Sequence, residues 1–355
     1  MKISKIPGLG RFGVFVDDLD FATISEEEWM NLGKLHLEHL VTIIRNVNIQ
    51  PHIYEQMMTK WGNQISLAAF RLLKKHNVLN IIDIYKEKKV NGILVDPQDQ
   101  EWLENAMNVL AIGEAGPATT MARVSGKKDK TGRPLGMFAE GELLWHSNES
   151  GNVDFSPGVA LLGYENVVGS CTGFLTTTDW YEDQTESFRS ELNEMIMCHE
   201  FTPGKINPGL RESQDHIMYR NMCPAPTEIP LIINSPAGIR GLHYSTNTIN
   251  TIKGMTREES DKMFEFINKT LFVDKYMYDH WYQQDNDLLI FDNSITLHRR
   301  LGGVSDRLCY RIQFDYANIE PTGVNRYLQE PFASEYTKKI NDVRTIIEKC
   351  KELYQ

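Results

Sequence analysis

Two histidines stand at the ends of apolar runs and are followed by arginines, a combination that can bind a metal ion and an acid. His146 ends the run GELLWH, and His298 ends the run DLLIFDNSITLH. Arg307 and Arg311 follow soon after the second histidine. An open Fe(II) site uses two imidazoles and one carboxylate on one face of the ion, which leaves positions for oxygen and a chelating cosubstrate. The sequence therefore predicts a metal site, provided that a β-framework brings the two imidazoles together.

The third ligand of such a site is not the expected carboxylate. Residues i and i+2 of a strand share a face, and the residue two positions after His146 is Asn148. Three explanations stay open. Asn148 binds the metal through its neutral oxygen, with weaker affinity than a carboxylate; Glu149 supplies the carboxylate, turned inward by a β-bulge; or the site is damaged or has another use. A deliberate replacement of an aspartate would also explain Asn148.

Other motifs in the sequence carry less information. Gly8, Gly10 and Gly13 spell GxGxxG, but this motif binds a dinucleotide only between a strand and a helix. Here a strand follows it, so we interpret the segment as a flexible lead-in. His199 and His216 are candidates for acid–base chemistry, but no neighbouring residues support that role. The motifs HExxH and GxSxG and the P-loop are absent from the sequence.

Secondary-structure signals divide the chain into a mixed first third and a β-rich remainder. Capping boxes at Ser25–Glu28 and Thr256–Glu259 predict two helix starts. Further helices are predicted at 52–61, 63–90, 97–111 and 180–198, and in the tail. Strands are predicted at residues 12–16 and in the runs VTIIRNV, MFAEGELLWH, GVALLGYENV, CTGFLTTT, GLHYSTNTI, DLLIFDN and CYRIQFDY. Many short strands favour a barrel or jelly roll over a parallel α/β sheet.

Composition limits the class of protein. The 355 residues are 41% hydrophobic and 24% charged, as in an ordinary globular protein. The formal charge of −11 argues against nucleic-acid binding, because a phosphate backbone would be repelled. No apolar run is long enough for a signal peptide or a membrane span, so no membrane partner is expected. The five scattered cysteines fit a reducing compartment, so we expect a cytoplasmic protein, either monomer or homo-oligomer.

The order of these motifs resembles one family. From about residue 12 to 317 the chain is similar to the TauD/TfdA-type (taurine dioxygenase-like) Fe(II)- and 2-oxoglutarate-dependent dioxygenases. The first strand, the first helix and the run VTIIRNV resemble that family's N-terminal segment, and WHSN resembles its WHxD box. CTGF resembles the strand whose threonine touches 2-oxoglutarate, and the residues from Phe291 to Arg311 resemble its closing DN…H…RxxxR box.

The resemblance implies a fold and a site. The fold would be α+β but mainly β, with a double-stranded β-helix (jelly-roll, cupin-like) core and flanking helices. We expect one domain: residues 1–112 packed on the core, a core at 113–330 with a lid insertion at about 200–235, and a C-terminal helix at 331–355. The metal ligands would be His146, Asn148 and His298, with Glu149 as the substitute carboxylate. Thr172, Arg307 and Arg311 would bind the cosubstrate.

The activity implied is hydroxylation of an unactivated C–H bond, coupled to conversion of 2-oxoglutarate and O2 into succinate and CO2. Arg311 suggests an anionic or zwitterionic small-molecule substrate. Three alternatives follow from Asn148 and from the modest specificity of each motif. The first is a halogenase, although those family members have Ala or Gly at the carboxylate position and Asn would fill the space needed by a halide. The others are a catalytically silent 2-oxoglutarate-binding protein and a structural or interaction protein without a working pocket.

Overall fold

A computed structural model describes residues 1–62, 89–90, 93–94, 121–128, 130–132, 135–136, 138, 141–151, 155–200, 227–302 and 306–319. The helices in this part are α1 (Glu26–His39), α2 (Pro51–Thr59), α6 (Thr178–Glu182), α7 (Glu186–Glu194), α10 (Arg257–Leu271) and the 3-10 turn η1 (Asp274–Tyr276). The strands are β1 (Lys2–Lys5), β2 (Val14–Asp17), β3 (Val41–Ile44), β4 (Lys89–Val90), β5 (Ile93–Leu94), β6 (Ala122–Ser125), β7 (Leu143–His146), β8 (Gly158–Glu165), β9 (Cys171–Thr176), β10 (Ile196–His199), β11 (Thr227–Pro230), β12 (Ile232–Asn234), β13 (Arg240–Leu242), β14 (Ile249–Ile252), β15 (Met277–Trp281), β16 (Asp287–Asp292), β17 (Thr296–Arg300) and β18 (Leu308–Phe314).

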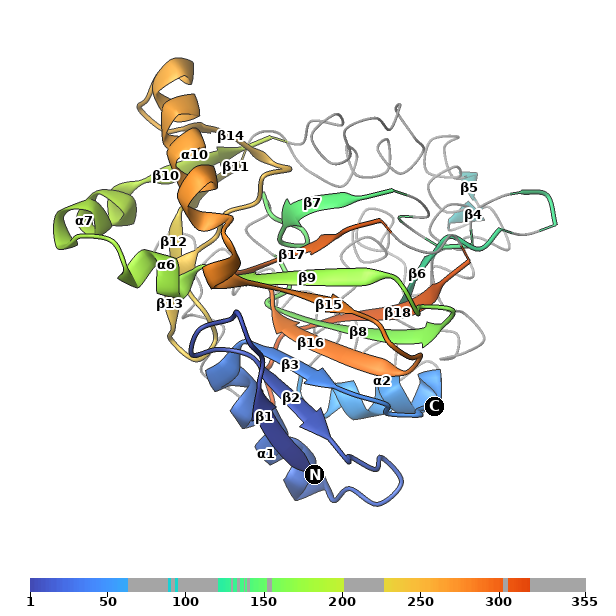
Figure 1. Ribbon diagram of the computed structural model, residues 1–355. Helices are drawn as coiled ribbons and strands as arrows, with labels where there is room; N and C mark the ends of the chain where they lie inside the picture. The colour runs from blue at the N-terminus through green and yellow to red at the C-terminus, as the bar shows by residue number, and fades with distance from the viewer. Residues whose placement is uncertain are drawn as a thin grey trace.

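Two β-sheets form the centre of the molecule, and helices lie outside them (Figure 1). The larger sheet has seven strands in the order β1-β2-β3-β16-β8-β18-β6, and the smaller has four in the order β15-β9-β17-β7. Within these two sheets only β2 and β3 pair in parallel. The described part of the chain is thus mainly β, as the sequence predicted, and its two central sheets are mostly antiparallel.

The outer face of the seven-stranded sheet packs against α1 and α2. Alternate residues of β16 and β18, such as Leu288, Ile290 and Ile312, join Trp29 and Trp61 in one buried cluster. The two indole rings stack with centroids 4.6 Å apart. A capping box begins α1, with the Ser25 side chain accepting from the backbone of Glu28 and the Glu28 carboxylate accepting from the backbone of Ser25.

The two sheets face each other across a second buried cluster. Leu289 and Phe291 of β16 point away from the helices and meet Phe174 of β9, whose ring lies 5.2 Å from that of Phe291 between centroids. Because side chains alternate along a strand, β16 fills both the helix-facing and the sheet-facing core. This explains why DLLIF is a continuous apolar run rather than an alternating one.

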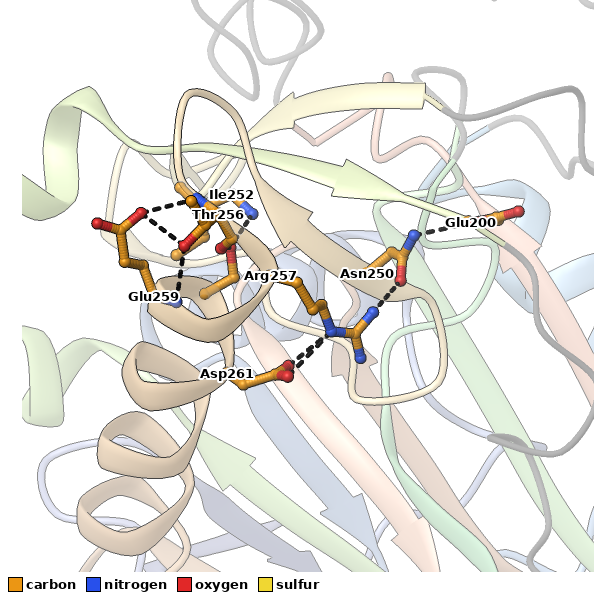
Figure 2. A network of polar contacts seen from close by, with 8 residues as sticks. Glu200, Asn250, Ile252, Thr256, Arg257, Glu259 and Asp261 are labelled. Atoms are coloured by element: carbon orange, nitrogen blue, oxygen red, sulfur yellow. Dashed lines mark hydrogen bonds and ion pairs between the residues drawn. The ribbon is translucent and has the colours of Figure 1, made fainter.

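The outer face of the four-stranded sheet is covered by α10 and by the short strands β10 to β14. Leu175 and Leu297 pack there with residues of those elements. Figure 2 shows hydrogen bonds between the elements of this outer layer. The Arg257 guanidinium donates to Asp261 and Asn250, and the Asn250 amide donates to Glu200. The second capping box, Thr256 with Glu259, begins α10 in the same view. These contacts connect the end of β10 to β14 and to the start of α10.

Several sequence predictions need correction. The helix predicted at 180–198 is three elements, α6, α7 and β10. Thr185 has extended backbone and caps a new helix that begins at Glu186, its hydroxyl accepting from the N–H of Phe188. The run GLHYSTNTI is mostly a connecting segment: its first two residues end β13 and its last residue begins β14. The supposed N-terminal lead-in belongs to the sheet: β1 pairs with β2, and Ile6 and Leu9 are buried.

Other predictions fall on residues outside the described part. This group comprises the helix predicted at 97–111, nearly all of the helix predicted at 63–90, the C-terminal helix at 331–355, most of the lid at 200–235, and His216. The last two residues of the range 63–90 are described, and they form the strand β4 instead of a helix. The division of the chain at residues 112 and 330 stays a prediction. In the described part of the chain no helix has the length and apolar character needed to cross a membrane.

Candidate active site

The two histidines singled out in the sequence lie side by side in the four-stranded sheet. His146 is the last residue of β7, and the antiparallel register of β7 and β17 places it directly opposite His298. The centroids of the two imidazole rings are 4.1 Å apart. His146 is only 7% exposed, and both rings point toward the space between the sheets, where His298 contacts the ring of Phe291. Strand pairing therefore joins two residues that are distant in the sequence.

Both imidazoles are held in the neutral form that binds metals. Burial lowers the pKa of His146 to about 4, and burial together with the charge of His146 lowers the pKa of His298 well below its ordinary value. The Nδ1 of His146 donates to the carbonyl oxygen of Leu144 at 2.6 Å, which leaves the lone pair on Nε2. The Nδ1 of His298 is buried without a hydrogen-bond partner. The contact with Leu144 gives His146 the partnered second nitrogen that is typical of a metal-binding imidazole.

Asn148, two residues after His146, lies beside the two imidazoles. It is 7% exposed and lines the same cavity as the two imidazoles. Its main chain is held on both sides by Asn293, whose Oδ1 accepts from the Asn148 N–H at 2.7 Å and whose Nδ2 donates to the Asn148 carbonyl at 2.9 Å. The Nδ2 of Asn148 itself is buried without a partner. This clamp fixes the backbone from which the Asn148 side chain reaches the cavity.

Glu149 has a different environment. Its backbone has a φ of 61°, and its carboxylate accepts hydrogen bonds from the N–H and the hydroxyl of Ser156, both at 3.1 Å. Glu149 is absent from the described residues that line the cavity. Across the described part of the chain, no three His, Cys, Asp or Glu side chains are grouped so that they could hold a metal ion. Asn148 thus lines the cavity with the imidazoles, whereas the Glu149 carboxylate lies against Ser156.

A cavity between the two sheets extends from the imidazoles and is lined by arginines. Cys309 and Arg311, alternate residues in the first half of β18, line the cavity together with Arg307, the residue before the strand. Arg307 is 5% exposed, and the Nε atoms of Arg307 and Arg311 are buried without a partner. Thr172 lines the wall from β9, with its hydroxyl 3.4 Å from that of Tyr282.

The charge of the cavity is unbalanced. Arg299, Arg300, Arg307 and Arg311 all line it, whereas none of the described lining residues is Asp or Glu. Arg299 is paired with Asp279 outside the cavity at 2.7 Å. The buried Nε atoms of Arg307 and Arg311 have no partner, and a buried guanidinium group is stabilised by an anion, so the cavity is suited to an acidic ligand.

Comparison with known proteins agrees with this geometry. Residues 3–312 match the family described as taurine catabolism dioxygenase TauD, TfdA family. The chain belongs to this family. The predicted resemblance is thereby confirmed, and it covers the N-terminal strands as well as the site. A search of curated proteins found no match.

Solved structures resemble this TauD/TfdA-family chain in fold. AAD-2, solved in complex with Mn(II) and N-oxalylglycine, aligns with a TM-score of 0.60 at 15% identity, covering 88% of this chain and 96% of AAD-2. A taurine dioxygenase from Burkholderia xenovorans aligns with a TM-score of 0.58 at 15% identity, covering 88% of each chain. At this identity the similarity establishes the shared fold.

One cavity residue of the TauD/TfdA-family chain was missed by the sequence reasoning. Arg300 is 6% exposed, and its guanidinium donates to the carbonyl oxygens of Gly141 at 2.8 Å and Phe138 at 2.6 Å. Burial and the neighbouring charge of Arg307 lower its pKa to about 9. The sequence contained one indication of this role: Arg300 stands two residues after His298, and residues i and i+2 of a strand share a face.

Proposed function

We propose that this protein is an Fe(II)- and 2-oxoglutarate-dependent oxygenase that hydroxylates a C–H bond of a small anionic or zwitterionic molecule, with release of succinate and CO2. The observation that carries the proposal is the pairing of His146 with His298 beside a cavity lined by arginines. Family membership supports the same class of chemistry. We also infer that the two facing sheets form the double-stranded β-helix expected for this class.

The residues present fit an iron ion at the paired histidines. His146 keeps a free lone pair on Nε2 because its Nδ1 is engaged with Leu144, and the buried Nδ1 of His298 has no partner in the protein. Asn148 would complete the set through its side-chain oxygen, a neutral ligand that binds a dication more weakly than a carboxylate. When bound, Fe(II) supplies the oxidative chemistry with O2 that amino-acid side chains lack.

The arginines and Thr172 would hold the cosubstrate. We assign the distal carboxylate of 2-oxoglutarate to Arg307 and Thr172, since a guanidinium can bind a carboxylate through two parallel hydrogen bonds. Arg311, two positions beyond Cys309 on the same strand face, would contact either the keto-acid end of the cosubstrate or an acidic group of the substrate. The apolar wall from Val159, Leu161 and Phe291 keeps water away from the reacting groups.

The activity test is formation of succinate. The protein is incubated with Fe(II), 2-oxoglutarate, ascorbate and a panel of small amino acids, sulfonates and carboxylates in air. We expect succinate above a boiled control, increased by the correct substrate, and lost in His298→Ala. The proposal is refuted if neither the natural sequence nor Asn148→Asp forms succinate with any compound of the panel.

Asn148 also favours a second candidate, a catalytically silent protein that binds 2-oxoglutarate. The cavity and its arginines would serve this role without a metal. Calorimetry distinguishes the two candidates: a silent binder takes up 2-oxoglutarate equally well with and without metal, whereas the oxygenase binds it at least tenfold more tightly when Mn(II) is present, because the ion chelates the keto-acid end.

A further inference from the structure

A second pair of buried histidines lies beyond the cavity described above. His199 ends β10 and His243 follows β13, with exposures of 2% and 0% and ring centroids 6.0 Å apart. Each ring has one nitrogen with a partner: Nδ1 of His199 lies 2.9 Å from the Thr248 hydroxyl, and Nδ1 of His243 donates to the Ser294 carbonyl at 2.8 Å. The Nε2 atoms of both rings are buried and have no partner.

His36 shows what a purely structural buried histidine looks like in this protein. Its exposure is 0%, and both ring nitrogens have partners, the Thr42 hydroxyl at 3.0 Å and the Tyr316 hydroxyl at 2.8 Å. Leaving a buried polar atom unpaired costs about 1–3 kcal/mol. Two such atoms on neighbouring rings, in a protein that satisfies His36 completely, therefore indicate a binding role.

The protonation of the pair defines what it can bind. A carbonyl oxygen only accepts hydrogen bonds, so the proton of neutral His243 is on Nδ1 and its Nε2 carries a lone pair. Burial lowers the pKa of His243 to about 4, and burial with the charge of His243 lowers that of His199 to about 3. Both rings are thus neutral, and Nε2 of His243 is an acceptor. Nε2 of His199 is an acceptor in the tautomer whose Nδ1 donates to the Thr248 hydroxyl, and this is the tautomer that the proposal below requires. The hydrogen-bond partners of the two rings, the Thr248 hydroxyl and the Ser294 carbonyl oxygen, carry no charge that could balance a buried ammonium group.

The pair lies next to the proposed metal site. The chain that leaves His146 runs directly against it: the Ser150 hydroxyl is 3.1 Å from that of Thr248, and a Cβ at Gly151 would lie 3.1 Å from the Cβ of His199. On the other side, Thr246 donates to the carbonyl of Trp145 at 2.6 Å. Further buried oxygens without a partner occur on these same segments: Ser147 Oγ, Ser245 Oγ, Asn247 Oδ1 and Ser294 Oγ.

We propose that His199 and His243 form a subsite for an uncharged carboxamide group of the primary substrate, with each Nε2 accepting a hydrogen bond from its N–H. A carboxamide nitrogen carries two donors, and donor–acceptor distances of about 2.9 Å to two rings are compatible with centroids 6.0 Å apart. The inference rests on the proposed function, because it assigns the group to the substrate of the oxygenase. The substrate would then carry two recognised groups: a neutral carboxamide that donates to the histidines, and an acidic group near Arg311.

The test measures the imidazole nitrogens directly. Protein labelled with 15N-histidine, without metal or 2-oxoglutarate, is titrated with acetamide, and in parallel with acetone, which has a similar shape but no N–H. We expect acetamide to shift the Nε2 resonances of His199 and His243, and acetone to leave them in place. The resonances of His36 serve as the internal control and stay constant. No shift with acetamide, or an equal shift with acetone, overturns the proposal.

A matched variant separates binding from structure. In His243→Asn the side-chain amide nitrogen can still donate to Ser294, but the Nε2 acceptor is gone. We expect at least fivefold weaker acetamide binding, reported by the remaining His199 signal; unchanged affinity contradicts the subsite. If this variant does not fold, the acetamide–acetone comparison on the natural sequence decides alone. If the protein forms succinate but acetamide has no effect, the proposed subsite is wrong and the proposed oxygenase activity stands. If acetamide shifts the resonances but no succinate forms, the oxygenase activity is wrong and the carboxamide-binding site stands.

Discussion

Replacing Arg307 by methionine should weaken cosubstrate binding without destabilising the ligand-free protein. Arg307 is 5% exposed and lines the cavity, where its charge is the second cause, after burial, of the lowered pKa of Arg300. Methionine fills similar volume and removes a charge that repels Arg300. The ligand-free variant should therefore be at least as stable as the natural protein, whereas its affinity for a dicarboxylate should fall.

The size of the effect follows from the hydrogen bonds lost. Hydrogen bonds to charged groups contribute about 1.5–3 kcal/mol each, and a loss of about 2.7 kcal/mol corresponds to roughly 100-fold in Kd. A ligand at 100 times its Kd stabilises the folded state by about 2.7 kcal/mol. At the same concentration a variant with 100-fold weaker binding would gain only about 0.4 kcal/mol.

The assay is urea unfolding with and without N-oxalylglycine in the presence of Mn(II), supported by calorimetric titration. Arg307→Lys keeps the charge but not the two-pronged geometry and should bind with intermediate affinity. Arg240→Met, an exposed position on β13, serves as the control and should bind normally. If Arg307→Met binds within threefold of the natural protein, Arg307 does not hold the carboxylate. If the ligand-free variant is strongly destabilised, the repulsion argument fails.

Three further predictions concern the metal site and the buried histidines. Asn148→Asp should bind Mn(II) at least tenfold more tightly, because it restores the anionic ligand; calorimetry showing equal or weaker binding would place the third ligand elsewhere. Asn293→Ala removes the partner of the Asn148 N–H and carbonyl and should cost about 2–3 kcal/mol in urea unfolding and weaken Mn(II) binding about tenfold, and a neutral result would mean that the clamp is dispensable. Stability should fall with acid: burial lowers the pKa of His36 and His243 to about 3 and about 4, so each contributes stability in full above its unfolded value of 6.5 and loses it as the pH falls toward the folded value. Protonation of each histidine should lower the free energy of unfolding by about 2 kcal/mol at pH 5. Equal urea midpoints near pH 7.5 and pH 5 would contradict this prediction.

The sequence alone determined those features that depend on residues close together in the chain, such as the starts of α1 and α10. Both capping boxes were predicted because a side chain and a backbone N–H three residues apart bond without help from the rest of the fold. The alternation of strand side chains also predicted that Arg307 and Arg311 share a face. The family was readable because the N-terminal strand and helix, the histidines, Thr172 and the arginines keep their order from about residue 12 to 317.

Tertiary structure decided the properties that depend on what packs against each residue. Glu149 was a reasonable metal ligand in the sequence, but a positive φ and the hydrogen bonds from Ser156 hold its carboxylate elsewhere. Arg300 looked like an ordinary strand residue until two carbonyl groups from a distant segment fixed its guanidinium in the cavity. His199 had no supporting neighbour in the sequence, and its partner ring, His243, comes from the segment after β13. Hydrogen-bond satisfaction and burial are set by residues far apart in the chain, so no local pattern contains them.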